Sequence, residues 1–249
     1  MKKRIPFVLA FLAIVCLTFG IQAQLKTIEV KSFDKVIISP HIKVSFSESP
    51  TEEVMIEESD VPLEKIKVEV KGKTLRIYLE DAKFLTKRNK YKTEYGKTKR
   101  PIYNGTEAVV AVSYKTLKRL SVRGEQTITF ESPLVQQKFR LVIYGESRVV
   151  MQEVKLNKLR TSIYGASELD IKSGSIENQK YTAYGESRVN TLGVENDITR
   201  ITAYGESDFK LNVTDKIKLT AFGEALVRYE GQPNVNRGLI IGKASIRPL

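Results

Sequence analysis

A motif centred on a single glycine recurs through the second half of this 249-residue chain. Successive glycines are 21, 20, 20, 20, 18 and 19 residues apart, and no long window between them shows helical periodicity. A short, near-constant period without helical patterning predicts a β-solenoid, in which each repeat forms one turn of a stack. The glycines are Gly124, Gly145, Gly165, Gly185, Gly205, Gly223 and Gly242.

Positions at even distances from each glycine hold apolar or small residues. The turn around Gly145, for example, has Ile143 two residues before it, Ser147 two after and Val149 four after. Because side chains alternate between the two faces of a strand, we expect even positions to build the core and odd positions to face outward. The glycine is expected where the strand bends or where the next turn would crowd a side chain.

The odd positions form three outward rows, because equivalent residues of stacked turns lie about 4.8 Å apart. A sign-alternating row comprises Arg148, Glu168, Arg188 and Asp208 and is interpreted as structural. The residues just before and just after each glycine form an aromatic row and an acidic row, which Ala166 interrupts. The candidate binding face consists of Tyr144, Tyr164, Tyr184, Tyr204, Phe222, Glu146, Glu186, Glu206 and Glu224.

This candidate face has two interpretations. Aromatic stacking along a sheet is stabilising in itself, so the row could serve the fold alone. Flat rings with a polar tip beside carboxylates also suit sugar faces and protein interfaces. The spacing of the acidic residues is not that of a calcium site, so neither a metal nor a cofactor is expected.

The first half of the mature chain predicts an N-terminal β region over residues 25–115, followed by the solenoid over 116–249. Short period-two runs indicate strands, and Lys71-Gly72-Lys73 predicts a tight hairpin turn between two of them. The predicted strands are Val36–Ser39, Ile42–Phe46, Val54–Glu57, Ile66–Val70, Leu75–Leu79 and Val109–Val112.

A basic insertion at residues 83–103 interrupts the strand pattern. The formal charge of the whole chain is +12. The insertion carries about +7 and the rest of the mature chain about +2, so we expect the basicity to be local to this segment. It is predicted to be a mobile surface loop that contacts an anionic surface or is simply solvated. Its candidate contact residues are Lys87, Arg88, Lys90, Lys92, Lys97, Lys99 and Arg100.

Residues 1–23 have the features of a secretory signal peptide. Three basic residues precede a short apolar run, and Ala23 provides a small residue at the expected cleavage point. The lone cysteine, Cys16, lies inside that run, so the mature chain is expected to lack disulfides. The only histidine, His41, is interpreted as structural. We therefore expect an exported protein of the periplasm, cell surface or extracellular space.

The repeated Tyr-Gly-Glu-Ser turns, the strand at Leu75–Ile77 and the closing Tyr229-Glu230-Gly231-Gln232-Pro233 resemble a known family. It is described as "putative auto-transporter adhesin, head GIN domain" and is common in Bacteroidetes-type bacteria. The resemblance covers nearly all of residues 33–246. It implies a right-handed, single-stranded β-helix-like fold in an envelope or extracellular setting, and it brings no catalytic residues.

These features predict a non-catalytic binding or adhesion module that uses the outward Tyr/Glu face. The expected partner is a glycan or an envelope protein, with a homo-oligomer as a further option and nucleic acid not expected. Two alternatives stay open. One is a polysaccharide-processing β-helix enzyme, which would need acidic and basic groups clustered in one groove. The other is a purely structural envelope protein.

Overall fold

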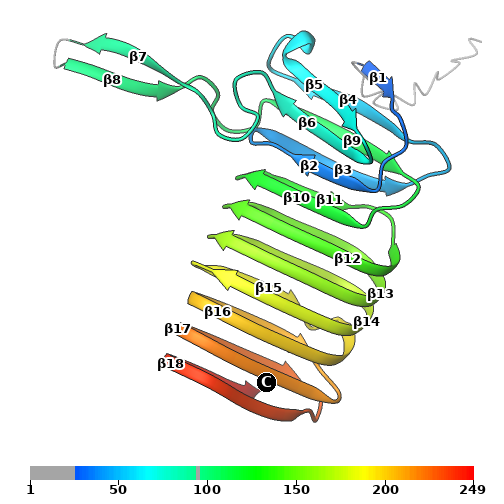
Figure 1. Cartoon of the computed structure of the whole chain (residues 1–249), viewed down its shortest axis with the longest axis vertical. Coiled ribbons are helices and arrows are strands. Elements are labelled where there is room, and N and C mark those ends of the chain that lie inside the picture. The colour runs from blue at the N-terminus through cyan, green and yellow to red at the C-terminus, as the bar shows by residue number, and fades with distance from the viewer. Residues whose placement is uncertain (1–25, 94–95) are drawn as a thin grey trace, which may run out of the picture.

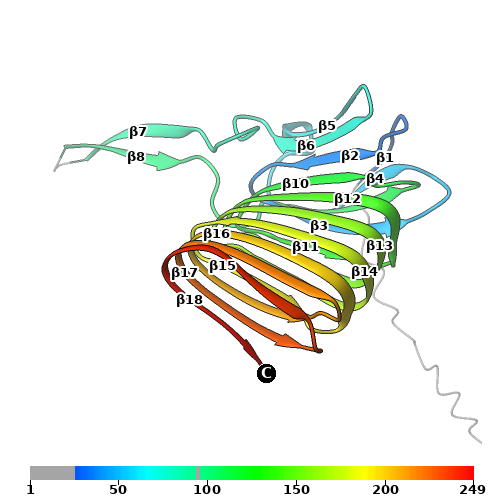
Figure 2. The same ribbon diagram turned by 60° about the horizontal axis from the view of Figure 1, so that its bottom comes forward.

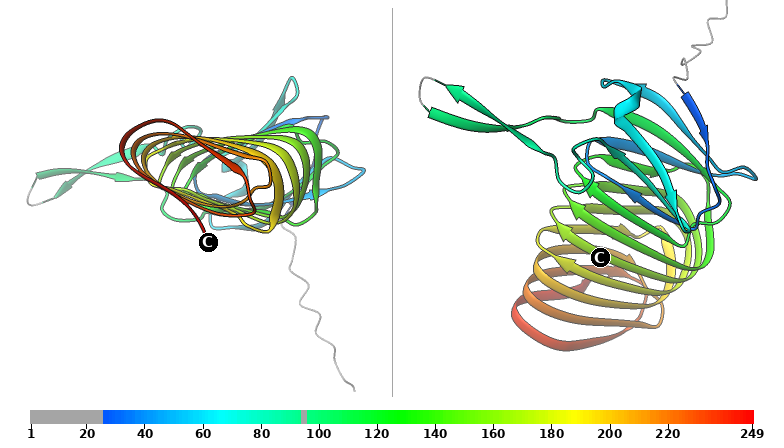
Figure 3. Two further views of the ribbon diagram at one scale, coloured as in Figure 1. Left: turned by 90° about the horizontal axis from the view of Figure 1, so that it is seen from below. Right: turned by 45° about the horizontal axis from the view of Figure 1, so that its top comes forward.

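The computed structural model describes residues 26–93 and 96–249, and it confirms a β-solenoid joined to an N-terminal β region (Figure 1). Viewed along the stack, the turns superpose as a flattened ring (Figure 3). The solenoid strands are β10 (Arg119–Gly124), β11 (Thr127–Phe130), β12 (Leu134–Gly145), β13 (Arg148–Gly165), β14 (Glu168–Tyr184), β15 (Ser187–Thr191), β16 (Val194–Asn212), β17 (Lys216–Glu230) and β18 (Asn234–Pro248).

Neighbouring turns pair in parallel, and the register aligns the repeats one above another. Gly145 pairs with Gly165, and Tyr164 pairs with Tyr184. The 18-residue spacing before Gly223 does not disturb this alignment, since Gly205 still pairs with Gly223. Equivalent side chains therefore form continuous rows along the stack, as the repeat predicts.

The N-terminal strands extend the same sheet. β2 and β3 pair in parallel with β10 and β11, so that Ile38 lies beside Val122 and Val44 beside Ile128. The backbone hydrogen bonds of one sheet thus join strands from both sides of the predicted boundary between residues 115 and 116. The division into two domains at that boundary stays a prediction. The six predicted strands are confirmed, and β1 is an addition. The strands are β1 (Lys26–Glu29), β2 (Lys35–Ile38), β3 (Ile42–Glu48), β4 (Glu53–Ser59), β5 (Ile66–Lys71), β6 (Thr74–Leu79) and β9 (Ala108–Tyr114), with one 3-10 turn at η1 (Leu63–Lys65).

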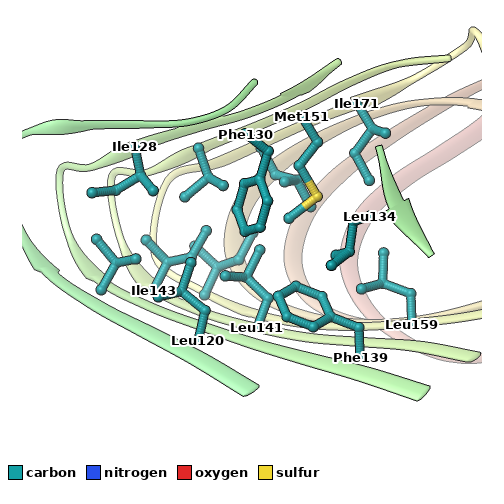
Figure 4. Close-up of a cluster of buried hydrophobic side chains, with 14 of the residues drawn as sticks. Leu120, Ile128, Phe130, Leu134, Phe139, Leu141, Ile143, Met151, Leu159 and Ile171 are labelled. Atoms are coloured by element: carbon teal, nitrogen blue, oxygen red, sulfur yellow. The ribbon is translucent and has the colours of Figure 1, made fainter. Parts of the chain in front are cut away.

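The core confirms the even-odd assignment. Residues two before, two after and four after each glycine are buried from Gly124 through Gly223. Apolar side chains from successive turns meet inside the ring, with Phe130 and Phe139 among them (Figure 4). Those two rings are 6.1 Å apart and packed edge to face. Each turn buries its apolar set only against its neighbours, which is the general basis of solenoid stability.

The central glycines are required for two reasons. Gly165 has a φ of +112°, a conformation that side chains rarely allow. A Cβ atom there would also lie 2.3 Å from the carbonyl oxygen of Gly145 in the preceding turn. The glycine row is therefore both the bend between two faces and a line of close backbone contact.

The basic insertion is not a loop throughout. It contains β7 (Arg88–Thr93) and β8 (Gly96–Pro101), which pair only with each other and project beyond the main sheet (Figures 1 and 2). The expectation of a loop is thus wrong for these strands. The segment alternates charged with polar residues rather than apolar with polar ones, so hydrophobic periodicity did not reveal them.

The predicted signal peptide, including Cys16, lies outside the described residues. Within the part of the chain that the structure describes, no helix is long and apolar enough to cross a membrane.

Candidate functional site

The aromatic row is a continuous stack of rings along the solenoid. It runs from Tyr144 through Tyr164, Tyr184 and Tyr204 to Phe222, one ring per turn, immediately before the central glycine of each turn. Adjacent ring centres are 4.7–4.9 Å apart, and adjacent planes are within 9° of parallel. The strand spacing itself sets this separation, because the residues are in register.

Each ring of the aromatic row covers a face of the next ring. The outer face of Tyr144 is covered by Arg123, whose guanidinium carbon lies 5.5 Å from the ring centre. Arg123 is also 5.0 Å from the ring centre of Phe84, at the base of the insertion. Phe222 is followed in register by Ile241. The row consequently presents ring edges and hydroxyl groups to solvent, and the expected stacking of sugars on ring faces has no free face to use.

The tyrosine hydroxyl groups are free to bind a ligand. The side chains of Tyr144, Tyr164 and Tyr184 are 38%, 37% and 38% exposed. None of the four tyrosine hydroxyls hydrogen-bonds to another described residue. The row is therefore a line of four hydrogen-bonding groups at about 4.8 Å intervals.

The acidic row lies directly across the glycine bend. Glu146, Glu186, Glu206 and Glu224 are exposed, and Ala166 interrupts the row as the sequence predicts. Glu206 pairs in register with Glu224. The only ion pair in this row among described residues joins Glu224 to Lys243, at 3.7 Å. Like charges on adjacent strands repel, so this row favours a partner that supplies donors or cations.

The sign-alternating row is in register but only partly ion-paired. Arg148 lies 3.6 Å from Glu168 and 3.5 Å from the buried carboxylate of Asp170. Asp208 pairs with Arg228 instead of Arg188. Exposed pairs of this kind contribute little, so the row serves mainly to favour in-register stacking.

The hairpin of β7 and β8 concentrates like charges. Lys90 lies directly opposite Lys99, and Lys92 lies opposite Lys97. Opposed residues of an antiparallel pair point to the same face, and residues two apart along a strand share it. One face of the hairpin therefore carries Arg88 and all four lysines. Arg100 lies on the other face, opposite Asn89, while Lys87 precedes β7 and pairs with Asp81 at 3.4 Å.

A hollow of about 920 Å³ lies where the base of the insertion meets the first ring of the aromatic row. His41 is part of its wall, and its two ring nitrogens bond to the carbonyl oxygen of Gly105 (2.7 Å) and the hydroxyl of Thr86 (2.6 Å). Gln126 accepts a 2.8 Å hydrogen bond from the His41 amide and donates a 3.0 Å bond to Gly105. His41 thus has the structural role that the sequence analysis assigns to it.

The solenoid has a fourth outward row that was not predicted from the sequence. The residue five positions before every glycine in the series is Lys or Arg. The rows predicted from the sequence used only positions from two before to four after each glycine, so the position five before it was not compared between turns. The expectation that basicity is confined to the insertion is therefore wrong.

No group of three or more His, Cys, Asp or Glu side chains among residues 26–93 and 96–249 is arranged to hold a metal ion. A β-solenoid whose outer faces carry continuous side-chain rows belongs to the repeat proteins that offer extended binding surfaces. The chain is a member of the family described as "Putative auto-transporter adhesin, head GIN domain", whose model matches residues 32–233. No curated protein matches the sequence.

Solved structures of similar fold include proteins from Bacteroides and Parabacteroides species. A "putative adhesin" from Bacteroides fragilis has a TM-score of 0.76 at 18% identity, over 90% of this chain and 95% of its own. A "putative adhesin" from Parabacteroides distasonis has a TM-score of 0.66 at 18% identity, over 90% and 95%. A "putative lipid binding protein" from the same species has a TM-score of 0.65 at 16% identity, over 90% and 96%. At these identities the likeness shows the fold.

Proposed function

We propose that this protein is a non-catalytic binding or adhesion module that acts in the cell envelope or outside the cell. Its contact surface is the outward Tyr/Glu face. The observation that carries the proposal is the line of four tyrosines, three exposed and Tyr204 half-buried, whose hydroxyls are unbonded within the described chain, beside an exposed row of carboxylates. The family description and the neighbouring adhesin structures support this class of function.

Recognition on this face would rely on repetition rather than on a deep pocket. Hydroxyls and carboxylates recur at the strand spacing of about 4.8 Å, so a linear ligand with repeating hydroxyl or amide groups can bond to several turns at once. A neutral glycan or an extended segment of an envelope protein has this chemistry. The stacked rings give the row a rigid geometry, which lowers the entropy lost on binding.

The enzyme alternative receives little support from the geometry. Glu186, Glu206 and Glu224 line a shallow hollow of about 680 Å³ with Arg188 and Lys243, but each carboxylate comes from a separate turn, and Lys243 is already paired with Glu224. In the hollow at the insertion, His41 already bonds through both ring nitrogens. Burial raises the pKa of Tyr103 there, with a further contribution from nearby carboxylates, which is opposite to what a tyrosine base requires.

Glycan-array and pull-down binding would test the proposal with two variants beside the wild type. Tyr164→Phe/Tyr184→Phe keeps the stacked rings and removes two hydroxyls, so it should weaken binding while leaving the fold intact. Tyr164→Ala/Tyr184→Ala should weaken binding further. Wild-type affinity in both variants would refute the role of this face. Release of reducing or unsaturated ends from acidic polysaccharides would refute the non-catalytic assignment.

The basic hairpin provides a second contact, to an anionic surface. Five cations on one face of a two-stranded sheet repel each other, and bound anions would relieve that repulsion. Deleting residues 83–103 should abolish salt-sensitive binding to anionic vesicles without affecting glycan binding by the Tyr/Glu face.

Self-association is a further option for the end of the stack. Among the described strands, β18 pairs with β17 alone, so its outer edge offers unpaired backbone groups to another strand. Sedimentation velocity across a concentration series would detect such a dimer. A structural envelope role, in which the rows only stabilise the stack, would leave all of the binding assays negative.

A further inference from the structure

A row of cations follows the solenoid for most of its length, and neither the candidate face nor the hairpin includes it. Lys35 on β2 pairs in register with Arg119, which pairs with Arg140, and the alignment continues turn by turn. All seven side chains are exposed, and six strand spacings make the row about 29 Å long. We call this the basic row: Lys35, Arg119, Arg140, Arg160, Lys180, Arg200 and Lys218.

The charges of the basic row are not compensated. Within the described residues, none of its members forms an ion pair or a hydrogen bond through its side chain. From Gly124 to Gly223, the outward positions on either side of the row contain no acidic residue and add Lys138, Lys158 and Lys216. Like charges on adjacent strands destabilise a sheet unless something neutralises them. An uncompensated row of this length therefore fits an anionic ligand with repeated charges.

The middle of the basic row is concave. A hollow of about 290 Å³ is lined by Phe139 and five cations. Of these cations only Lys118 has an acidic partner among the described residues, Asp34 at 3.0 Å. The remaining four, two from β12 and two from β13, surround the hollow with positive charge. The lining residues are Lys118, Lys138, Phe139, Arg140, Lys158 and Arg160.

The surface beside the basic row carries small side chains with hydroxyl groups. The basic row and the aromatic row lie on the same strands, four residues or about 13 Å apart. Between them are the half-buried hydroxyls of Ser162, Thr182, Thr202 and Thr220. No large apolar side chain among the described residues is exposed in this strip. The strip can therefore accept a hydrated chain, but it offers nothing to insert into a lipid bilayer.

We propose that the basic row binds an acidic polysaccharide in an extended conformation along the solenoid axis. Carboxylate or sulfate groups would meet the Arg and Lys side chains, and sugar hydroxyls would meet the Ser and Thr strip. A single straight file of cations suits a chain with one anionic group per sugar, because one pyranose residue is similar in length to one strand spacing. A nucleic acid duplex would place only one of its two backbones on this row. The proposal does not depend on the Tyr/Glu face.

Binding of the purified protein to two polymers would test this inference. Polygalacturonate supplies carboxylates, heparin supplies sulfates, and neutral dextran is the blank. The variant Arg140→Gln/Lys158→Gln/Arg160→Gln should bind at least about tenfold more weakly than the wild type, and wild-type binding should weaken as salt rises. The charge-keeping variant Arg140→Lys/Arg160→Lys should retain most of the affinity, which separates lost charge from a damaged fold.

A matched control removes three cations elsewhere. Lys43→Gln/Lys115→Gln/Lys155→Gln makes the same change in net charge with exposed lysines outside the row, and it should bind both polymers as the wild type does. Equal weakening in the two triple variants, no binding to either polymer, or tighter binding to duplex DNA would overturn the inference. Tighter binding to phosphatidylglycerol vesicles by a variant that lacks the hairpin (residues 83–103 deleted) would overturn it too. Tyr164→Phe/Tyr184→Phe in the same assay should leave polymer binding intact. The Tyr/Glu proposal can therefore fail independently.

Discussion

The rings of Tyr184 and Tyr204 lie 4.7 Å apart and are parallel to within 2°. They come from equivalent positions of consecutive turns, and their separation equals the spacing of the strands that carry them. Each ring in the middle of the row has such a neighbour on both sides. The stack is thus a consequence of in-register repetition. The same side chains contribute to the stability of the solenoid through their ring contacts and to its surface chemistry through their hydroxyl groups.

Replacing Tyr184 separates these two roles. Tyr184→Ala removes two ring contacts and should lower the unfolding free energy by about 1–3 kcal/mol, since each aromatic pair contributes roughly 0.5–1.5 kcal/mol. Tyr184→Phe keeps both contacts and should unfold as the wild type does. Chemical denaturation followed by circular dichroism would measure both variants. Equal stability of all three proteins would show that the stack does not support the fold.

The glycine row makes a sharper prediction about stability. Gly165→Ala forces a side chain into a φ of +112° and against the carbonyl oxygen of Gly145, so it should cost about 3 kcal/mol or more. Gly72→Ala is the control, because Gly72 also has a positive φ of +60° but has nothing within 4 Å of the added Cβ. It should cost only about 1–2 kcal/mol. Similar melting temperatures for the two variants would contradict the close approach of the turns.

The solenoid could be predicted from the sequence because the repeat length and the even or odd distance of each residue from its glycine can both be counted along the chain. Val149 and Leu169 lie inside and Tyr164 lies outside because each is a fixed number of residues from a glycine. The stacking of ring on ring was less accessible, since it depends on the side-chain orientation that the register allows. The contact of Val44 with Ile128 joins segments 84 residues apart, and no periodicity links them.

The missed features have a different cause. Arg140 and Arg160 belong to a row only when the chain is aligned by turn, and a charge total over 100 residues averages them with acidic residues of other faces. Pairing of Lys90 with Lys99 in the hairpin runs against the usual preference for opposite charges across strands. Both departures place uncompensated charge on the surface, and such violations of the rules that stabilise a fold are expected at functional sites.

Tyr114 provides a prediction for alkaline pH. Burial, as the main cause, raises its pKa to about 12 from the ordinary value near 10. The folded state favours the neutral phenol, so this stabilisation is complete below pH 10 and is lost as the pH rises toward 12. Tyr114→Phe has no such ionisation. Between pH 10 and 12, the unfolding free energy of the wild type should therefore fall further than that of Tyr114→Phe, by up to about 2–3 kcal/mol. Urea denaturation at a series of pH values would measure both proteins. Parallel declines would contradict a buried, neutral Tyr114.

Gln126 ties the first turn of the solenoid to the N-terminal region. It replaces the small residue of the other repeats, and its side chain bonds to the amide of His41 and the carbonyl of Gly105. Gln126→Ser restores the repeat pattern but is too short to reach both groups. The loss of two partly buried hydrogen bonds should cost about 1–3 kcal/mol. Hydrogen exchange of the His41 amide should accelerate in this variant, whereas unchanged protection would show that Gln126 is not the link.

The charge arrangement of the hairpin allows its stability and its binding to be shifted in opposite directions. Lys99→Glu places a carboxylate opposite Lys90 and turns a repulsive cross-strand pair into an attractive one. The hairpin amides should then exchange more slowly at low salt, while binding to phosphatidylglycerol vesicles should weaken several-fold. Arg100→Glu makes the same change in net charge on the other face, opposite Asn89. It should leave vesicle binding nearly unchanged, because the face with five cations stays complete. Equal loss of vesicle binding in the two variants would mean that the hairpin attracts anions only through its total charge.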